Sequence, residues 1–161
     1  MSKNGLTISL NEVLFYFTRA GFGVNASIGV SEDFARSNIW IAQNGFDPSE
    51  CSLLALDNLD SQTSSLSIQF EKTGDGSHLF CPEDKVLSAI EASVSCVDWL
   101  EFNGLDGDLK LTNVDSPLLV VSALGANQCT GIQVSWTDKS NNHYEVNLKD
   151  DIEWEIISSS E

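Results

Sequence analysis

His78 and Cys81 are the residues whose types and closeness in the chain could form a nucleophile and its base. A cysteine acts as a nucleophile when a base lies within hydrogen-bonding distance and a third group orients that base. Residues three apart in an extended segment, however, point to opposite faces of the strand. We therefore predict that His78 and Cys81 do not pair, and we assign no catalytic residues from the sequence.

The spacing of the potential metal ligands gives equally little support for a metal site. His78 and His143 are the two histidines, and the chain has no His-x-His, His-x-x-x-His or Cys-x-x-Cys motif of the kind that zinc sites use. Asp106-Gly107-Asp108 resembles the beginning of a calcium-binding loop. It lacks Asp or Asn at every second position and the bidentate Glu that closes such a loop. We predict no metal site and no cofactor.

The arginines of the N-terminal part are the candidate ligand contacts. Arg19 and Arg36 are the only basic residues of residues 1–60 apart from Lys3. An arginine among carboxylates usually forms a local salt bridge, and a tryptophan on an amphipathic element usually packs in the core. If a carboxylate-bearing ligand binds, we expect it to contact Arg19, Arg36 and Trp40. A concave pocket that collects Arg36, a carboxylate and a Trp would favour an enzyme.

The charge balance limits the classes of partner. The chain has 24 Asp and Glu residues and 8 Lys and Arg residues, which gives a formal net charge of −16. Proteins bind nucleic acids largely by neutralising phosphates with Lys and Arg, and anionic membrane surfaces attract basic segments. We therefore expect neither a nucleic acid nor a membrane as partner. The acidic surface either docks a basic partner or keeps the protein soluble.

The cysteines and the apolar segments favour a cytoplasmic protein. No apolar run approaches the roughly 20 residues that cross a membrane, and the chain begins with a capped amphipathic segment instead of a signal peptide. The cysteines are widely spaced, so we interpret them as free thiols, with two disulfides as the alternative. They are Cys51, Cys81, Cys96 and Cys129.

Capping patterns predict three short helices in residues 1–60. Ser9-Leu10-Asn11-Glu12 is a capping box, and the helix that follows it should end at Gly21 or Gly23. Ser31 is the expected cap of the second helix, which Gly45 would end. Asp47-Pro48-Ser49-Glu50 begins the third helix, with Asp47 as the cap.

Residues 61–161 read as mixed and strand-rich. Alternating apolar residues predict a hairpin over 66–80 and a strand near 109–113. Residues 86–102 fit both a strand and a helix, and we favour a helix at 94–100. Asp115-Ser116-Pro117 resembles another helix start.

The C-terminal third predicts three consecutive strands. Residues 132–136, 144–148 and 152–156 alternate in polarity and are joined by short polar turns, which indicates an antiparallel meander. Helices followed by strands are typical of the α+β class. We predict a single domain over residues 1–161, in which an N-terminal cluster of short helices packs on a mainly antiparallel C-terminal sheet.

Several segments resemble an uncharacterised bacterial family, domain-of-unknown-function family 3726. The similar segments are Ser9-Leu10-Asn11-Glu12, Ala20-Gly21, Ser31 to Arg36, Trp40, Gly45-Phe46-Asp47 and, more loosely, Val114 to Leu119. The chain departs from the family at Phe22-Gly23-Val24-Asn25. The resemblance implies a bacterial, cytoplasmic protein and no particular chemistry, because no activity is assigned to the family.

Three hypotheses for function follow from these patterns. The leading one is a non-catalytic binding or regulatory domain of unknown ligand, either as a monomer or as a homo-oligomer. The second is a small-molecule enzyme that uses carboxylates with Arg19 or Arg36 in a cleft between helices and sheet. The third is an acidic scaffold that binds a basic protein. We favour a non-enzyme because no recognisable reactive group stands on any of the predicted elements.

Overall fold

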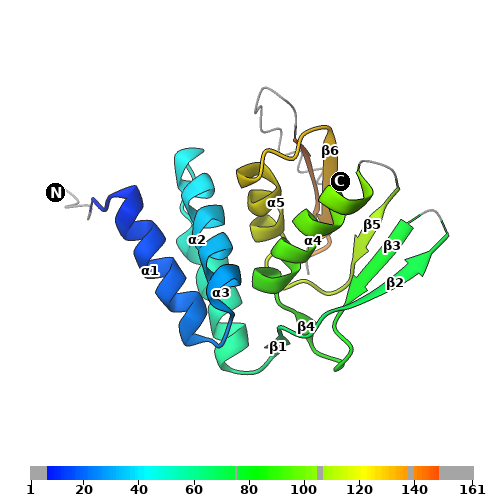
Figure 1. The fold of residues 1–161 in the computed structure, drawn as a ribbon, viewed down its shortest axis with the longest axis horizontal. Coiled ribbons are helices and arrows are strands. Elements are labelled where there is room, and N and C mark those ends of the chain that lie inside the picture. The colour runs from blue at the N-terminus through cyan, green and yellow to red at the C-terminus, as the bar shows by residue number, and fades with distance from the viewer. Residues whose placement is uncertain (1–6, 75, 105–106, 138–139, 149–161) are drawn as a thin grey trace.

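The computed structural model describes residues 7–74, 76–104, 107–137 and 140–148. Figure 1 shows helices α1 to α3 at one end of the molecule, α4 and α5 in the middle, and strands β2, β3 and β5 at the other end. The helices are α1 (Leu10–Gly23), α2 (Ile28–Gln43), α3 (Ser49–Asp60), α4 (Ala89–Asn103) and α5 (Pro117–Ala126). The strands are β1 (Ser64–Ser65), β2 (Gln69–Thr73), β3 (Gly76–Phe80), β4 (Val86–Leu87), β5 (Leu109–Leu111), β6 (Ile132–Thr137) and β7 (His143–Leu148).

The capping box at the start of α1 confirms the sequence prediction. The Ser9 hydroxyl accepts a hydrogen bond from the Glu12 N–H at 3.2 Å, and the Ser9 N–H donates to Glu12 Oε2 at 2.7 Å. The side chain of each residue therefore accepts a hydrogen bond from the backbone N–H of the other, and this pair of bonds defines where the helix begins. It ends at Gly23, as predicted.

The predicted start of the second helix is wrong. Helix α2 begins at Ile28, and its cap is Ser27, whose hydroxyl accepts from the Val30 N–H at 3.3 Å. Ser31 instead lies inside the helix, buried, where its hydroxyl donates to the Ser27 carbonyl at 2.8 Å. A methyl group on Gly21 would lie 3.0 Å from the Ser31 hydroxyl. α1 and α2 therefore approach each other closely at Gly21 and Ser31, where Ser31 is small enough to fit. No local sequence pattern reveals this contact.

The predicted start of the third helix is correct to within one residue. Helix α3 begins at Ser49, and Pro48 occupies the cap position. The Asp47 carboxylate accepts a hydrogen bond from the Ser49 N–H at 2.8 Å, so Asp47 still satisfies one of the exposed donors of the first turn.

The α+β class is confirmed, and the described strands form three small sheets. Strands β2 and β3 form the predicted hairpin, and β6 pairs antiparallel with β7 so that Val134 faces Val146. Two parallel pairings, β1 with β4 and β3 with β5, connect segments that are distant in the sequence. The predicted strand at 152–156 and the carboxylate pair Asp150-Asp151 lie outside the described residues.

The ambiguous stretch 86–102 contains both kinds of element. Strand β4 (Val86–Leu87) comes first, and α4 follows from Ala89, so the helix favoured at 94–100 is present but begins earlier. Its first residue, Ala89, donates its N–H to Asp115 Oδ1 at 2.8 Å. A side chain 26 residues away therefore caps this helix, and local sequence could not indicate where it begins. The predicted helix after Asp115 is confirmed as α5.

The buried apolar residues form one cluster that draws on both parts of the chain. Helix α2 lies between α1 on one side and α4 and α5 on the other. Its Trp40 is buried, and the indole lies directly against Gly125 of α5, where a side chain would overlap the ring. Among the described residues, no helix combines the length and the apolar content needed to cross a membrane.

Candidate functional site

A cleft of about 750 Å³ lies where α3 and α5 meet strands β4, β5 and β6. Ligand sites in proteins are commonly concavities of about 300–1,000 Å³ with mostly apolar walls and a few polar groups. The apolar lining residues are Leu54, Val86, Leu111, Val114, Pro117, Val120, Val134 and Trp136. The polar lining residues are Asn58, Thr63, Asn113, Asp115, Ser135, Thr137 and Ser140.

Backbone pairing between distant segments builds one side of this cleft. The Leu87 N–H donates to the Asn113 carbonyl at 2.9 Å, and the Asp115 N–H donates to the Leu87 carbonyl at 3.2 Å. These bonds place residues 113–115 beside β4. The first turn of α5 follows at once, and the buried Ser116 hydroxyl donates to the Cys51 carbonyl of α3 at 2.9 Å. The loop that carries Asp115 is thereby attached to three elements.

Asp115 is the ionisable side chain of this cleft. Its Oδ1 accepts from the Ala89 N–H, whereas its Oδ2 is buried and, although the Asn58 and Ser64 side chains lie beside the carboxylate, accepts no hydrogen bond of regular geometry among the described residues. Burial raises the pKa of the Asp115 carboxyl, and the Ala89 N–H opposes that rise, as do the nearby Asn58 and Ser64 side chains to a smaller extent. A buried acceptor without a partner carries a desolvation cost that a ligand donor would relieve.

Two buried hydroxyls near Asp115 also form no hydrogen bond of regular geometry among the described residues. They belong to Ser64, in β1, and Ser88, the cap residue of α4. The parallel pairing of β1 with β4 brings them together, since Ser64 faces Val86 and the Ser88 N–H donates to the Ser65 carbonyl at 3.2 Å. Buried polar atoms usually have partners, so this junction stands out among the described residues.

An aromatic pair forms the side of the cleft contributed by the β6–β7 hairpin. The rings of Trp136 and Tyr144 are stacked, with centroids 5.2 Å apart and an interplanar angle of 13°. The stacking fixes the orientation of the indole that lines the cleft, while Leu54 of α3 and Val120 of α5 supply apolar surface. The cleft can therefore hold a molecule that has an apolar or aromatic body and a polar group for Asp115.

The structure places the predicted ligand contacts Arg36 and Trp40 in different environments. Arg36 is exposed, donates a hydrogen bond to Asp33 at 2.6 Å and forms an ion pair with Glu32 at 3.7 Å on its own helix. Trp40 is buried in the core. Arg36 therefore forms a local salt bridge and Trp40 packs in the core, which are the two alternatives to ligand binding given above.

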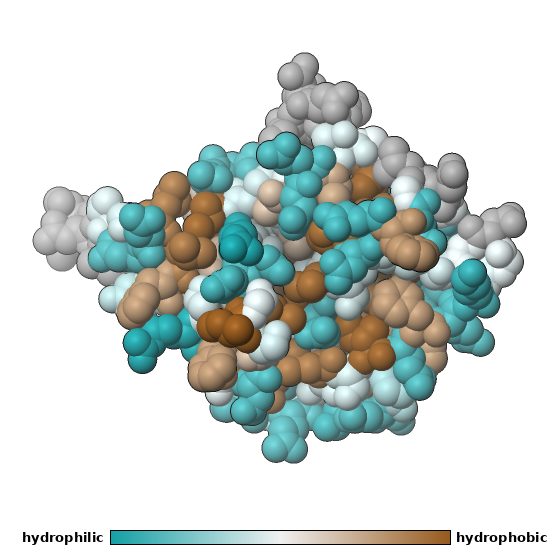
Figure 2. Space-filling view, viewed as in Figure 1, coloured by the Kyte–Doolittle hydropathy of each residue, from teal (hydrophilic) through white to brown (hydrophobic). Residues whose placement is uncertain are grey.

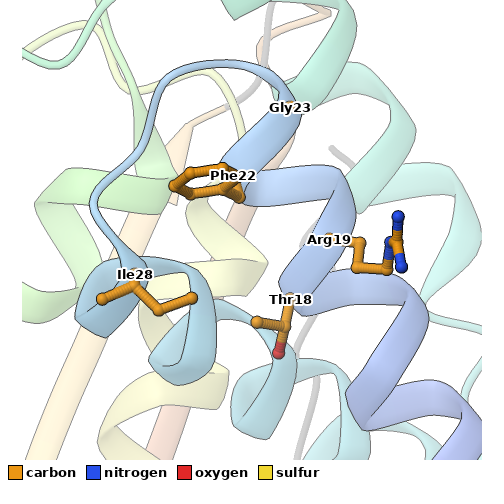
Figure 3. A pocket seen from close by; sticks show the side chains of 5 residues that line it. All are labelled: Thr18, Arg19, Phe22, Gly23 and Ile28. Carbon is orange, nitrogen blue, oxygen red and sulfur yellow. The ribbon is translucent and has the colours of Figure 1, made fainter.

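Arg19 lines a second, smaller cavity of about 370 Å³ at the end of α1. In Figure 3, the side chains of Phe22 and Ile28 lie on one side of this cavity, and the Arg19 guanidinium extends away from them. That guanidinium lies 5.2 Å from the centre of the Phe15 ring, a cation–π distance.

His78 and Cys81 make separate contacts. The His78 Nε2 lies 2.5 Å from the Thr112 hydroxyl, and its ring centroid is 5.0 Å from that of Phe80, whereas Cys81 packs against the core. All four cysteines are free, as predicted. In the described part of the chain, no three His, Cys, Asp or Glu side chains gather as a metal site would require, and the Asp106 end of the loop at 106–108 lies outside that part.

Sequence reasoning did not identify the cleft. Asp115-Ser116-Pro117 reads in the sequence as a helix start, and no local pattern marks Asn58 or Trp136 as residues that line a cleft. The one available signal was an acidic residue between an apolar strand and a Ser-Pro helix start. The pairing of β4 with residues 113–115, which makes Asp115 half-buried, is not encoded locally.

Comparison of the chain with protein-family models, with curated proteins and with solved structures finds no match in any of the three.

Proposed function

We propose that the protein is a non-catalytic binding domain whose ligand site is the cleft between α3, α5 and β6. One observation carries the proposal. A cleft of about 750 Å³ is lined by a half-buried carboxyl group, Asp115, whose Oδ2 accepts no hydrogen bond of regular geometry among the described residues, although the Asn58 and Ser64 side chains lie beside it. The stacked Trp136 and the apolar side chains around it would bury the body of a ligand, and Asp115 would fix its orientation.

The ligand class that fits this chemistry is a small amine or another molecule with a cationic or N–H-bearing nitrogen. A carboxylate accepts hydrogen bonds, and a charged donor forms the stronger bond with it. The net charge of −16 favours the approach of a cation from solution and disfavours that of an anion. On the same charge argument, we place nucleic acids and anionic membranes outside the partners of this domain.

The enzyme hypothesis has less support than the binding hypothesis. An enzyme site built on Arg36 and Trp40 would need both side chains to face a ligand. Arg36 instead pairs with Glu32 and Asp33, and Trp40 is buried against Gly125. We further propose a reducing compartment such as the cytoplasm, because four unpaired thiols persist most readily there.

A thermal-shift screen of paired ligands tests the proposal. Amines are compared with the corresponding carboxylic acids at equal size and ionic strength, because a ligand of the native state raises Tm. At hundredfold excess over Kd, an amine that binds should raise Tm by about 5–10 °C. The matching acid should leave Tm unchanged. If no amine raises Tm, or if amines and acids raise it equally, the proposed ligand class is wrong.

Two variants locate the binding site. Asp115→Asn keeps an oxygen to accept from the Ala89 N–H but removes the charge, so the amine-dependent shift should disappear. Asp57→Asn removes an equal charge from the exposed side of α3 and should preserve the shift. A shift that survives in Asp115→Asn, or that disappears in Asp57→Asn alone, would place binding elsewhere.

A further inference from the structure

The solvent-facing side of α1 carries large aromatic side chains. Phe15, Tyr16 and Phe22 are 54%, 59% and 62% exposed, although each lies within a well-formed helix. Figure 2 shows hydrophobic surface over this end of the molecule, in the region of α1. Exposed apolar surface of this kind on a soluble protein commonly marks an interaction site.

These aromatic residues are not part of the side that packs in the fold. Helix α1 buries Val13 and Gly21 against α2, and Phe17 meets Phe34 edge-on with centroids 5.7 Å apart. Phe15 and Phe22 lie on the opposite side, because residues seven apart share a face of a helix. The outer side of α1 is therefore apolar by sequence and has no extensive neighbour among the described elements.

A regular seam runs along this outer side. Glu12, Phe15, Arg19 and Phe22 are separated by three, four and three residues, which is the spacing by which one helix packs along another. Ile8, four residues before Glu12 and just ahead of the helix, is 44% exposed and extends the seam. An apolar centre is thus flanked by one acidic and one basic residue.

The two charges of the seam suit a second copy of the same helix. Glu12 lies three residues before Phe15, and Arg19 lies four residues after it. If two copies of α1 run antiparallel about a two-fold axis near Phe15, Glu12 of each copy faces Arg19 of the other. Ile8 of one copy then lies level with Phe22 of the other, beside the cavity of about 370 Å³ in Figure 3.

Both charged groups are available for such a pair. A hydrogen bond from the Ser9 backbone N–H lowers the pKa of the Glu12 carboxyl, so Glu12 is ionised near neutral pH. Both of its bonds to Ser9 use Oε2. Arg19 has no carboxylate partner within the described residues, where its one contact of note is the Phe15 ring.

The charge of α1 also argues against a basic partner. In a chain of net charge −16, the segment Leu10–Gly23 contains one acidic and one basic residue and is neutral. A cationic peptide would therefore find no excess negative charge here. Two copies of the acidic protein would repel each other little at this neutral surface, and they could exchange two opposite-charge contacts.

We propose that the outer side of α1 is the interface of a homodimer in which the two copies of α1 pack antiparallel, centred on Phe15. The interface is separate from the cleft at Asp115, so the two proposals succeed or fail independently. A single helix face buries less area than the 1,200–2,000 Å² typical of stable complexes, so we expect a Kd of about micromolar order.

Sedimentation of the full chain at about 1 to 200 µM measures the expected equilibrium. The wild-type protein should change from monomer to dimer within this range, and Phe15→Glu should remain monomeric throughout. Phe102→Glu, on α4, is the matched control because Phe102 is 91% exposed and outside the seam. It should dimerise like the wild type. Circular dichroism of each variant confirms that the helices are intact, since both substituted side chains are exposed.

The charge pairing is tested separately. Arg19→Glu places two carboxylates opposite each other and should raise the dimer Kd at least about tenfold, whereas Arg19→Lys should change it by less than about threefold. A wild-type protein that is monomeric at every concentration overturns the proposal. The proposal is also overturned if the Phe15→Glu or the Arg19→Glu variant dimerises as tightly as the Phe102→Glu control.

Discussion

The Trp40 indole of α2 lies directly against Gly125 of α5, and the missing side chain of Gly125 is what permits the two helices to approach. A methyl group at this position would overlap the ring, so one of the helices would have to move. Gly125→Ala should therefore destabilise the protein by about 1–3 kcal/mol, as overpacking of a core does. The Tm should fall by about 2–12 °C.

The control for this substitution is Gly29→Ala in the first turn of α2. A methyl group there meets no atom within 4 Å, and Ala is a better helix former than Gly. We expect Gly29→Ala to leave Tm unchanged or to raise it by a few degrees. If both variants melt alike, the Trp40–Gly125 contact does not limit the packing of α2 on α5.

A buried pair between Asn38 and Ser52 links α2 to α3. The Ser52 hydroxyl donates to Asn38 Oδ1, and Asn38 Nδ2 donates to the Phe34 carbonyl at 2.8 Å. Both side chains are fully buried. Ser52→Ala would leave the Asn38 oxygen without a partner, and we expect a loss of about 1–3 kcal/mol in denaturant unfolding.

The double variant Asn38→Leu with Ser52→Ala removes both polar partners together. The double variant should lose less stability than the sum of the losses of the two single variants, because neither partner is left unsatisfied. Strictly additive losses in this cycle would show that the two side chains do not depend on each other.

The stability of the fold should depend on pH through Asp115. Burial raises the folded-state pKa of this carboxyl above its unfolded value. Between the two pKa values the folded protein holds more protons than the unfolded chain, so the free energy of unfolding contributed by Asp115 falls as pH rises through this window. The contribution of Asp115 is therefore least favourable above its folded pKa.

Asp115→Asn removes this dependence. We expect the stability of the variant minus that of the wild type to increase as pH is raised from about 3 to about 7. Urea unfolding at several pH values measures the difference, in which the other carboxylates cancel. A difference that is constant or decreasing with pH would mean that the carboxyl is not disfavoured by burial.

Cys96 should be protected from thiol reagents in the native protein. It is fully buried, and burial raises the pKa of its thiol to about 12. At pH 8 only about one thiol in ten thousand would then be ionised, and the thiolate is the reactive form. Alkylation followed by peptide mass mapping should leave Cys96 unmodified until denaturant is added, when all four cysteines react. Native labelling of Cys96 as fast as Cys81 would contradict this.

Where a local interaction defines an element, the sequence predicted it well. Ser9 and Glu12 are three residues apart and cap each other, so the start of α1 was readable. The alternation in β6 and β7 likewise predicted their pairing as a hairpin. The start of α2 was not readable in the same way, because Ser27 and Ser31 are both plausible caps. What distinguishes them is the contact of Ser31 with Gly21 on another helix.

The candidate site depends on contacts of longer range, and it was missed for that reason. Asp115 acquires its environment from Ala89, Ser64 and Asn58, which come from three other elements. The parallel bridge between Leu87 and Val114 assembles them, and a bridge across such a separation leaves no periodic signature in the sequence. The arginines were conspicuous in the sequence because they are rare, but the pairing of Arg36 with Asp33 is an ordinary contact within one helix turn.

Among the described elements, α2 is the one extensive neighbour of α1, and this affects how readily α1 opens in the native state. Segments with few buried contacts unfold at a lower free energy than the whole domain and exchange their amide hydrogens sooner. α2 packs on α4 and α5 through contacts that do not involve α1, so among the described helices the amides of α1 should exchange first and its peptide bonds should be cleaved first by proteases. Because a second copy would cover α1, this early exchange should slow as the protein concentration rises, while exchange in α5 stays the same.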